Sequence, residues 1–83
     1  MSMIKRYMDE SEIVRETAEW IAEMSDDVER GAALTVLFEE CGRMAEAYAD
    51  PFGVAKLLVN GAVESYHSAR GYKAVLSYLG VAA

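Results

Sequence analysis

The chain has a single cysteine, Cys41, among its 83 residues. One cysteine excludes a disulfide within the chain and a zinc site built from several thiolates. A chain without disulfides fits a reducing compartment, so we expect a cytoplasmic protein. The first residues lack the apolar segment of a secretory signal. No stretch approaches the ~18 consecutive apolar residues of a membrane span, so we expect no membrane partner.

Proline and glycine are also scarce, with one proline and six glycines in the chain. Few helix-breaking residues leave room for long helices. Hydrophobic residues make up 53% of the chain, which is too many for a disordered segment. A chain this short forms one small core, so the sequence predicts a single acidic helical domain over residues 1–83.

Basic residues are few in the first part of the chain. Residues 1–50 hold thirteen acidic and five basic residues, a charge of −8, whereas residues 51–83 carry +2 and the whole chain −6. The first part would repel nucleic acid and the second is too weakly basic to bind it. We therefore expect no direct nucleic-acid binding and a basic protein surface as the partner. The alternative is that the charge only keeps a small protein in solution.

Capping residues and apolar spacing predict an all-α fold, a bundle of three longer helices and a short C-terminal one. A loose arm over residues 1–8 precedes the first helix, which begins within Asp9–Ser11. Asp26 caps the second helix. Asp50 ends it and caps the third helix, with Pro51 at the first helical position.

The third helix has one predicted end and one ambiguity. Arg70-Gly71 is typical of a helix C-terminus, which leaves a short last helix from Tyr72 to Leu79, ended by Gly80. Asn60-Gly61 is a hairpin signal, but a helix through it segregates apolar from polar residues better. We therefore predict the helix, with the hairpin as the alternative.

Each longer helix carries apolar residues at helical spacing, which predicts its buried face. These faces hold Ile13, Thr17, Ile21 and Met24, flanked by Val14 and Trp20, in the first helix; Ala33, Leu34, Leu37, Phe38, Cys41, Met44, Ala45 and Tyr48 in the second; and Val54, Ala55, Leu58, Val59, Ala62, Tyr66 and Ala69 in the third. Glu39 and Arg43, on the polar side of the second helix, form a predicted i,i+4 pair.

Four glutamates at spacings of four, three and four form a line on the first helix: Glu12, Glu16, Glu19 and Glu23. Like charges at these spacings repel by a few tenths of a kcal/mol per pair, so the line is either well solvated or met by a basic partner. A third interpretation is a mimic of the phosphates of DNA. Trp20 lies at the border of this face and is our candidate anchor for a partner, because tryptophan is frequent among hot-spot residues.

Glu64 and His67 have the Glu-x-x-His spacing of carboxylate-bridged metal bundles. Such a site needs further carboxylates, for which Glu40 or Glu46 are candidates, and a second motif from a dimer partner. We expect no metal and no cofactor, since a four-residue match is weak and a solvated surface pair is the favoured explanation of the spacing. Cys41 lies within an apolar face and is expected to be a buried core residue.

No motif of an enzyme is present, neither a nucleophile elbow, a phosphate-binding loop nor a dinucleotide fingerprint, and we expect no enzymatic activity. A DNA-binding helix-turn-helix drawn over residues 57–70 would place His67 where an apolar residue is usual, and we do not favour it. The C-terminal part holds more apolar surface than a lone helix pair can cover. We expect a homodimer through Leu57, Val63, Tyr66, Tyr72 and Tyr78.

These features predict a small, non-catalytic module that binds a partner protein and regulates or inhibits it. Small acidic helical proteins occur among viral and mobile-element inhibitors of host machinery, a likeness of size and charge alone. A nucleic-acid-binding protein is one candidate partner, because its surface is basic. The alternatives are a metal-binding bundle that uses Glu64 and His67, or a structural subunit of a larger assembly.

Overall fold

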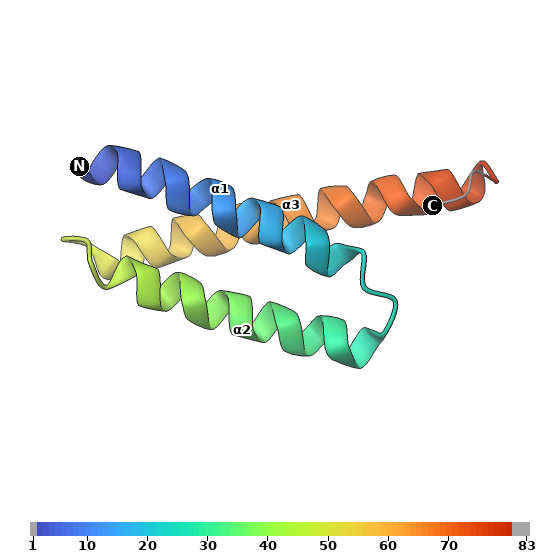
Figure 1. Cartoon of the computed structure of the whole chain (residues 1–83), viewed down its shortest axis with the longest axis horizontal. Helices are drawn as coiled ribbons and strands as arrows, with labels where there is room; N and C mark the ends of the chain where they lie inside the picture. The colour runs from blue at the N-terminus through green and yellow to red at the C-terminus, as the bar shows by residue number, and fades with distance from the viewer. Residues whose placement is uncertain (1, 81–83) are drawn as a thin grey trace.

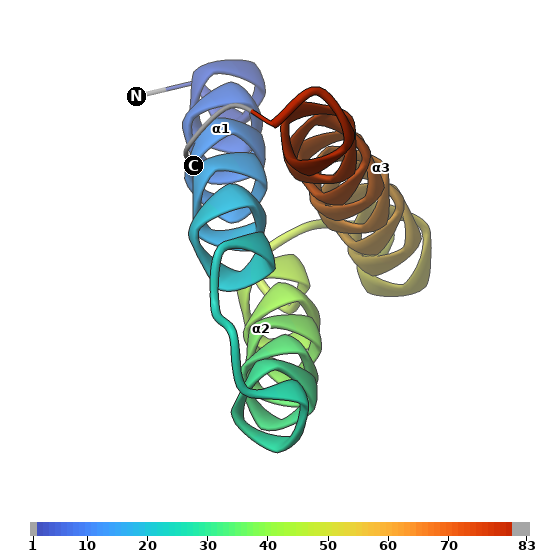
Figure 2. The same ribbon diagram turned by 90° about the vertical axis from the view of Figure 1, so that its right-hand side faces the viewer.

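The computed structural model describes residues 2–80, which form three α-helices (Figure 1). These are α1 (Met3–Ala22), α2 (Asp27–Ala45) and α3 (Pro51–Tyr78). α1 and α3 run in the same direction and α2 runs back between them, and an end-on view places the helices at the corners of a triangle (Figure 2). The prediction of an all-α bundle is confirmed.

Short polar side chains cap the helix starts. The Asp26 carboxylate accepts hydrogen bonds from the backbone N–H groups of Val28 and Glu29, at 2.8 and 3.0 Å. Asp50 accepts one from the N–H of Gly53 at 3.0 Å, and Pro51 stands at the first helical position. Each cap satisfies N–H groups that have no partner inside the helix. The predicted starts of α2 and α3 are therefore confirmed.

The predicted loose arm is instead the first part of α1, which begins at Met3. The Ser2 hydroxyl caps this helix by accepting a hydrogen bond from the N–H of Lys5 at 3.2 Å. Tyr7 then packs against the core, with its ring edge-on to Tyr48 at a centroid distance of 6.5 Å. Because α1 starts six residues earlier than predicted, it spans the full length of α2.

The core is small and built largely from short side chains. Its buried members are Val14, Ala18, Ile21, Leu37, Cys41, Leu58 and Ala62. The predicted faces of α2 and α3 are confirmed, since all their members are buried or half-buried. The face of α1 is rotated from the prediction, because Val14, Ala18 and Ile21 are buried while the side chains of Ile13 and Trp20 are 55% and 70% exposed.

α3 is continuous, so neither the hairpin alternative at Asn60-Gly61 nor the short fourth helix is present. Gly61 is buried, and a Cβ added there would lie 3.2 Å from Nε of Arg15. Glycine at this position therefore lets Arg15 of α1 lie close to the α3 backbone. Gly71 keeps a negative φ, and Gly80, with φ of +76°, follows the end of the helix instead.

Other details of the bundle differ from the sequence pattern. α2 ends at Ala45, five residues before the predicted Asp50, and residues 46–50 form the turn into α3. Arg43 forms an ion pair with Glu40 at 2.7 Å rather than with Glu39. Over the described part of the chain, no helix has the length and hydrophobicity required to cross a membrane.

Gly71→Ala tests the continuity of α3. Nothing lies within 4 Å of an added Cβ at this exposed position, so alanine should raise the free energy of unfolding by about 0.5–1 kcal/mol. Gly80→Ala is the matched control and should be destabilising, because φ is positive there. Urea denaturation measures both changes, and a loss of stability in Gly71→Ala would indicate a helix break at this residue.

Candidate partner-binding surface

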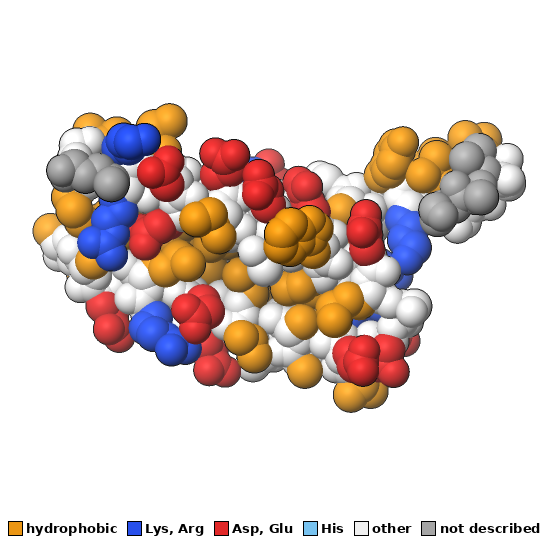
Figure 3. Space-filling model, in the orientation of Figure 1, with side chains coloured by type: hydrophobic (Ala, Val, Ile, Leu, Met, Phe, Trp, Pro, Cys, Tyr) orange, Lys and Arg blue, Asp and Glu red, His pale blue; other side chains and the backbone are white. Residues whose placement is uncertain are grey.

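Glu12, Glu16, Glu19 and Glu23, together called the acidic row, all have exposed side chains on α1. The row lies opposite the buried face of this helix. In Figure 3, acidic side chains gather along the upper edge of the molecule, over α1. Within residues 2–80, none of the four carboxylates is part of an ion pair.

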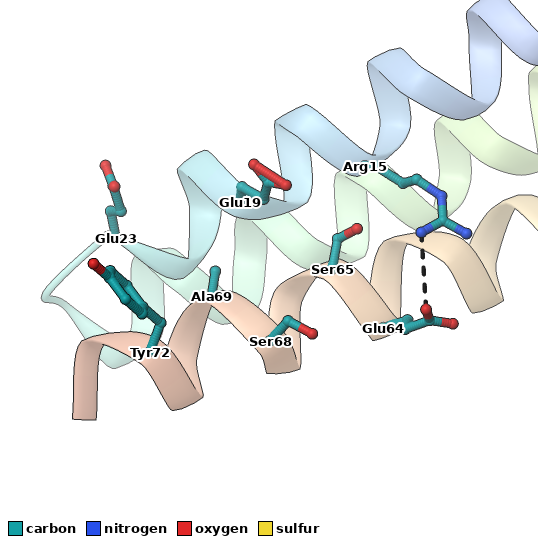
Figure 4. A pocket seen from close by; sticks show the side chains of 8 residues that line it. All are labelled: Arg15, Glu19, Glu23, Glu64, Ser65, Ser68, Ala69 and Tyr72. Atoms are coloured by element: carbon teal, nitrogen blue, oxygen red, sulfur yellow. Dashed lines mark ion pairs between the residues drawn. The ribbon is translucent and has the colours of Figure 1, made fainter. Parts of the chain in front are cut away.

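The basic groups nearest the acidic row are directed elsewhere. Arg15 reaches across to α3 and pairs with Glu64 at 4.0 Å (Figure 4). Arg70 and Lys73 donate hydrogen bonds to the backbone carbonyls of Ala22 and Glu23, at 3.0 and 3.2 Å. These carbonyls end α1, where the helix dipole attracts positive charge. These basic groups therefore form no ion pair with the acidic row within residues 2–80.

Two open grooves run beside the acidic row. The first, of about 440 Å³, lies between the second half of α1 and α3 (Figure 4), and is lined by Arg15, Glu19, Glu23, Glu64, Ser65, Ser68, Ala69 and Tyr72. The second, of about 490 Å³, lies along the first half of α1 and is lined by Tyr7, Met8, Ser11, Glu12, Arg15, Glu16 and Glu19. Their shallow shape is suited to contact with a protein surface rather than to enclosure of a small molecule.

Trp20 lies on the flank of α1 next to the acidic row, with 70% of its surface exposed. Ile13 is seven residues away, which places it two turns earlier on the same flank. Figure 3 shows hydrophobic side chains gathered along the line between α1 and α2, below the acidic edge. The structure thus places exposed apolar side chains beside carboxylates that have no ion-pair partner in the described part of the chain.

The metal-site residues do not come together. Glu64 pairs with Arg15, and the exposed His67 lies edge-on to Tyr66 at a centroid distance of 5.5 Å. Glu40 is paired with Arg43. Among the residues that the structure describes, no group of three or more His, Cys, Asp or Glu side chains could hold a metal ion. The Glu-x-x-His spacing is therefore a feature of one exposed helix face.

Two further sequence patterns are resolved by the fold. The helix-turn-helix considered over residues 57–70 is not formed, because this segment is uninterrupted helix within α3. Cys41 is fully buried in the core, as predicted. Burial raises the pKa of its thiol to about 11, so the reactive thiolate is scarce at neutral pH.

The residues predicted to form a dimer interface have different surroundings. Tyr66 is half-buried, and its hydroxyl accepts a hydrogen bond from Nε of Arg30 at 2.9 Å. Val63 is also half-buried. Leu57, Tyr72 and Tyr78 are 57%, 68% and 89% exposed. The structure thus leaves these last three available for contact, whereas Tyr66 already holds α2 against α3.

Sequence reasoning missed an apolar groove at the N-terminal end of the bundle, of about 300 Å³. It is lined by Met3, Ile4, Tyr7, Tyr48, Val54 and Leu57. The helical spacing of Met3 and Tyr7 is the sequence signal for this groove, and the prediction of a loose arm does not use it. The Tyr48 hydroxyl at its edge donates a hydrogen bond to Glu10, and burial first, then this bond, raises the pKa of Tyr48 to about 12.

Comparison of the chain with protein-family models, curated proteins and solved structures finds no match. The function is therefore inferred from the surface itself.

The burial of Cys41 predicts how stability depends on pH. The ordinary thiol pKa is near 9 and the folded value about 11, so only the unfolded chain loses this proton as pH rises from 9. The thiol's contribution is therefore intact below pH 9 and declines towards pH 11. Urea denaturation should show a smaller decline from pH 8 to 10 in Cys41→Ala than in the unmodified chain, and equal declines would contradict the burial.

Proposed function

We propose that this protein is a non-catalytic binding module that docks on a basic protein surface and regulates or inhibits that partner. One observation carries the proposal: the acidic row is exposed along α1 without an ion-pair partner in residues 2–80. Repulsion among these carboxylates disfavours the free state slightly. A partner that supplies Lys or Arg side chains removes this repulsion and gains charge-assisted hydrogen bonds.

Long-range attraction and short-range packing have separate roles in this proposal. The charge of −8 on residues 1–50 attracts and orients a basic surface, which mainly raises the association rate. The indole of Trp20 would then be desolvated on contact and act as the anchor that slows dissociation. Ile13, on the same flank, extends the apolar contact by two turns of α1.

The distribution of charge favours a mixed surface over a mimic of DNA. Mimicry requires carboxylates arrayed in two dimensions on one face. In the view of Figure 3 the acidic side chains lie along the upper edge over α1 and the lower edge over α2, with hydrophobic side chains between them. A partner surface with basic side chains around an apolar depression fits this arrangement, and such a surface can belong to a nucleic-acid-binding protein.

Charge reversal in the acidic row tests the proposed role. The tagged chain is used to capture proteins from its host lysate at low and at moderate salt, and these are identified by mass spectrometry. We expect one stoichiometric partner that is lost as salt rises, because screening weakens exposed charge pairs. The double variant Glu16→Lys/Glu19→Lys should lose that partner even at low salt.

The matched control is Glu39→Lys/Glu46→Lys, which makes the same charge change at exposed positions in α2 and at its C-cap. The control variant should still capture most of the partner, because it changes the net charge but leaves the acidic row intact. Equal loss in both double variants would indicate a general charge effect, and undiminished capture by Glu16→Lys/Glu19→Lys would contradict the role of the acidic row.

Trp20→Ala separates binding from folding. With 70% of the side chain exposed, the substitution should change the free energy of unfolding by no more than about 0.5 kcal/mol. Affinity for the captured partner should fall about thirtyfold, as expected for a hot-spot residue worth about 2 kcal/mol. Titration calorimetry with the purified partner gives the affinity, and an unchanged value would remove Trp20 from the contact.

A further inference from the structure

The C-terminal end of α3 extends beyond the rest of the bundle (Figure 1). α3 has 28 residues and α1 has 20, lengths of about 42 and 30 Å at 1.5 Å per residue. The last hydrogen bonds from α3 to α1 come from Arg70 and Lys73. Residues 74–80, called the α3 extension, follow these contacts.

The α3 extension and the turn before it carry exposed apolar side chains. Tyr72, Val75, Tyr78 and Leu79 are 68%, 54%, 89% and 65% exposed. In Figure 3, hydrophobic side chains lie along the upper side of this projecting end. Two turns of helix have little stability of their own, so another surface that covers them would stabilise the α3 extension.

A row of exposed residues on α3 joins the two ends of the molecule at the spacing of an antiparallel coiled coil. It consists of Leu57, Glu64, Ser68, Gly71, Val75 and Tyr78, at spacings of seven, four, three, four and three. Small or polar residues occupy its middle, and apolar ones its ends. Leu57 also belongs to the apolar groove at the N-terminal end.

Two pairs of the row, Leu57 with Val75 and Glu64 with Ser68, lie symmetrically about position 66. Antiparallel pairing of two α3 helices there sets Leu57 of one copy opposite position 75 of the other, and Val54 opposite position 78. Both pairs are apolar. Glu64 then faces position 68, a serine that can donate a hydrogen bond to the carboxylate. No apolar residue of the row meets a charge.

Charge also favours a second copy as the occupant. Glu64 is the last acidic residue in the chain, so the segment after it holds Arg70 and Lys73 and no carboxylate. The remainder of the molecule is acidic. The end of α3 is therefore the part of one copy that another copy attracts.

We propose that two copies form a two-fold symmetric dimer through antiparallel α3 helices, in which each α3 extension lies in the N-terminal apolar groove of the other copy. One helix end alone would bury little of the ~1,200 Å² that stable interfaces need. Two-fold symmetry makes the contact twice, and the α3 row between the two contacts adds to it. This inference does not rest on the proposed function, since the purified chain alone tests it.

Engineered disulfides test the register directly. Positions 57 and 75 are 18 residues apart on one helix, about 27 Å, whereas a disulfide requires Cα atoms within about 7 Å. A mixture of Leu57→Cys and Val75→Cys chains should therefore form a disulfide-linked dimer on mild oxidation, with a linked 57–75 peptide in mass spectrometry. Neither variant alone should cross-link, and Cys41 is buried and does not compete. No linked peptide in the mixture, or equal cross-linking of each variant alone, would overturn the register.

Val75→Glu tests the association without cysteines. Val75 is 54% exposed and lies beyond the last hydrogen bonds from α3 to α1, so the bundle should fold normally by circular dichroism. The dimer dissociation constant should rise at least about tenfold, because a charge is placed in an apolar contact. Val28→Glu, at an 82% exposed position on α2, is the matched control and should remain dimeric. Sedimentation equilibrium gives the masses. A monomeric unmodified chain at millimolar concentration, or equal effects of both variants, would refute the dimer.

Discussion

The close packing of α1 on α3 is the contact on which the other features of this protein depend. Ala18 of α1 and Ala62 of α3 are fully buried in the core, and both side chains are short enough to let the helices approach. Gly61 extends the close contact by giving Arg15 room against the α3 backbone. Larger residues at these positions would separate the helices, since a small core has no other space into which to relax.

This packing also decides where charge and apolar surface lie. With Val14, Ala18 and Ile21 turned inward, the opposite side of α1 presents the acidic row and one flank presents Trp20. The cations near the row are held by other contacts within the bundle. Arg15 forms an ion pair with Glu64, and Arg70 and Lys73 donate hydrogen bonds to the carbonyls at the end of α1. The acidic row thereby keeps a strong local charge, while the free carbonyls at the end of α1 still gain hydrogen-bond donors.

The two proposed surfaces differ in physical character. The acidic row acts at long range and is sensitive to salt, whereas the α3 row is apolar at its ends and requires contact. Binding of a basic partner and pairing of two copies therefore respond differently to ionic strength. A dimer would present two acidic rows, which raises the effective affinity for a partner that carries two basic sites.

Several parts of the fold can be predicted from the chemistry of residues that are close in the sequence. Asp26, Asp50 and Pro51 mark helix starts because capping involves only neighbouring backbone groups. The apolar faces of α2 and α3, the burial of Cys41 and the alignment of the four glutamates follow from a period of 3.6 residues, which the sequence fully encodes.

Only the tertiary structure decided the remaining features, because each depends on residues distant in sequence. Gly61 and Gly71 are helical since α1 and the continuing helix support them, although glycine by itself favours a turn or a helix end. The start of α1 at Met3 depends on Tyr7 packing near Tyr48. The N-terminal groove, the projecting end of α3 and the absence of ion pairs to the acidic row among residues 2–80 arise from the relative lengths and positions of three helices. Spacing along one helix gives the face on which a residue lies, but the burial of that face is set by the helices packed against it.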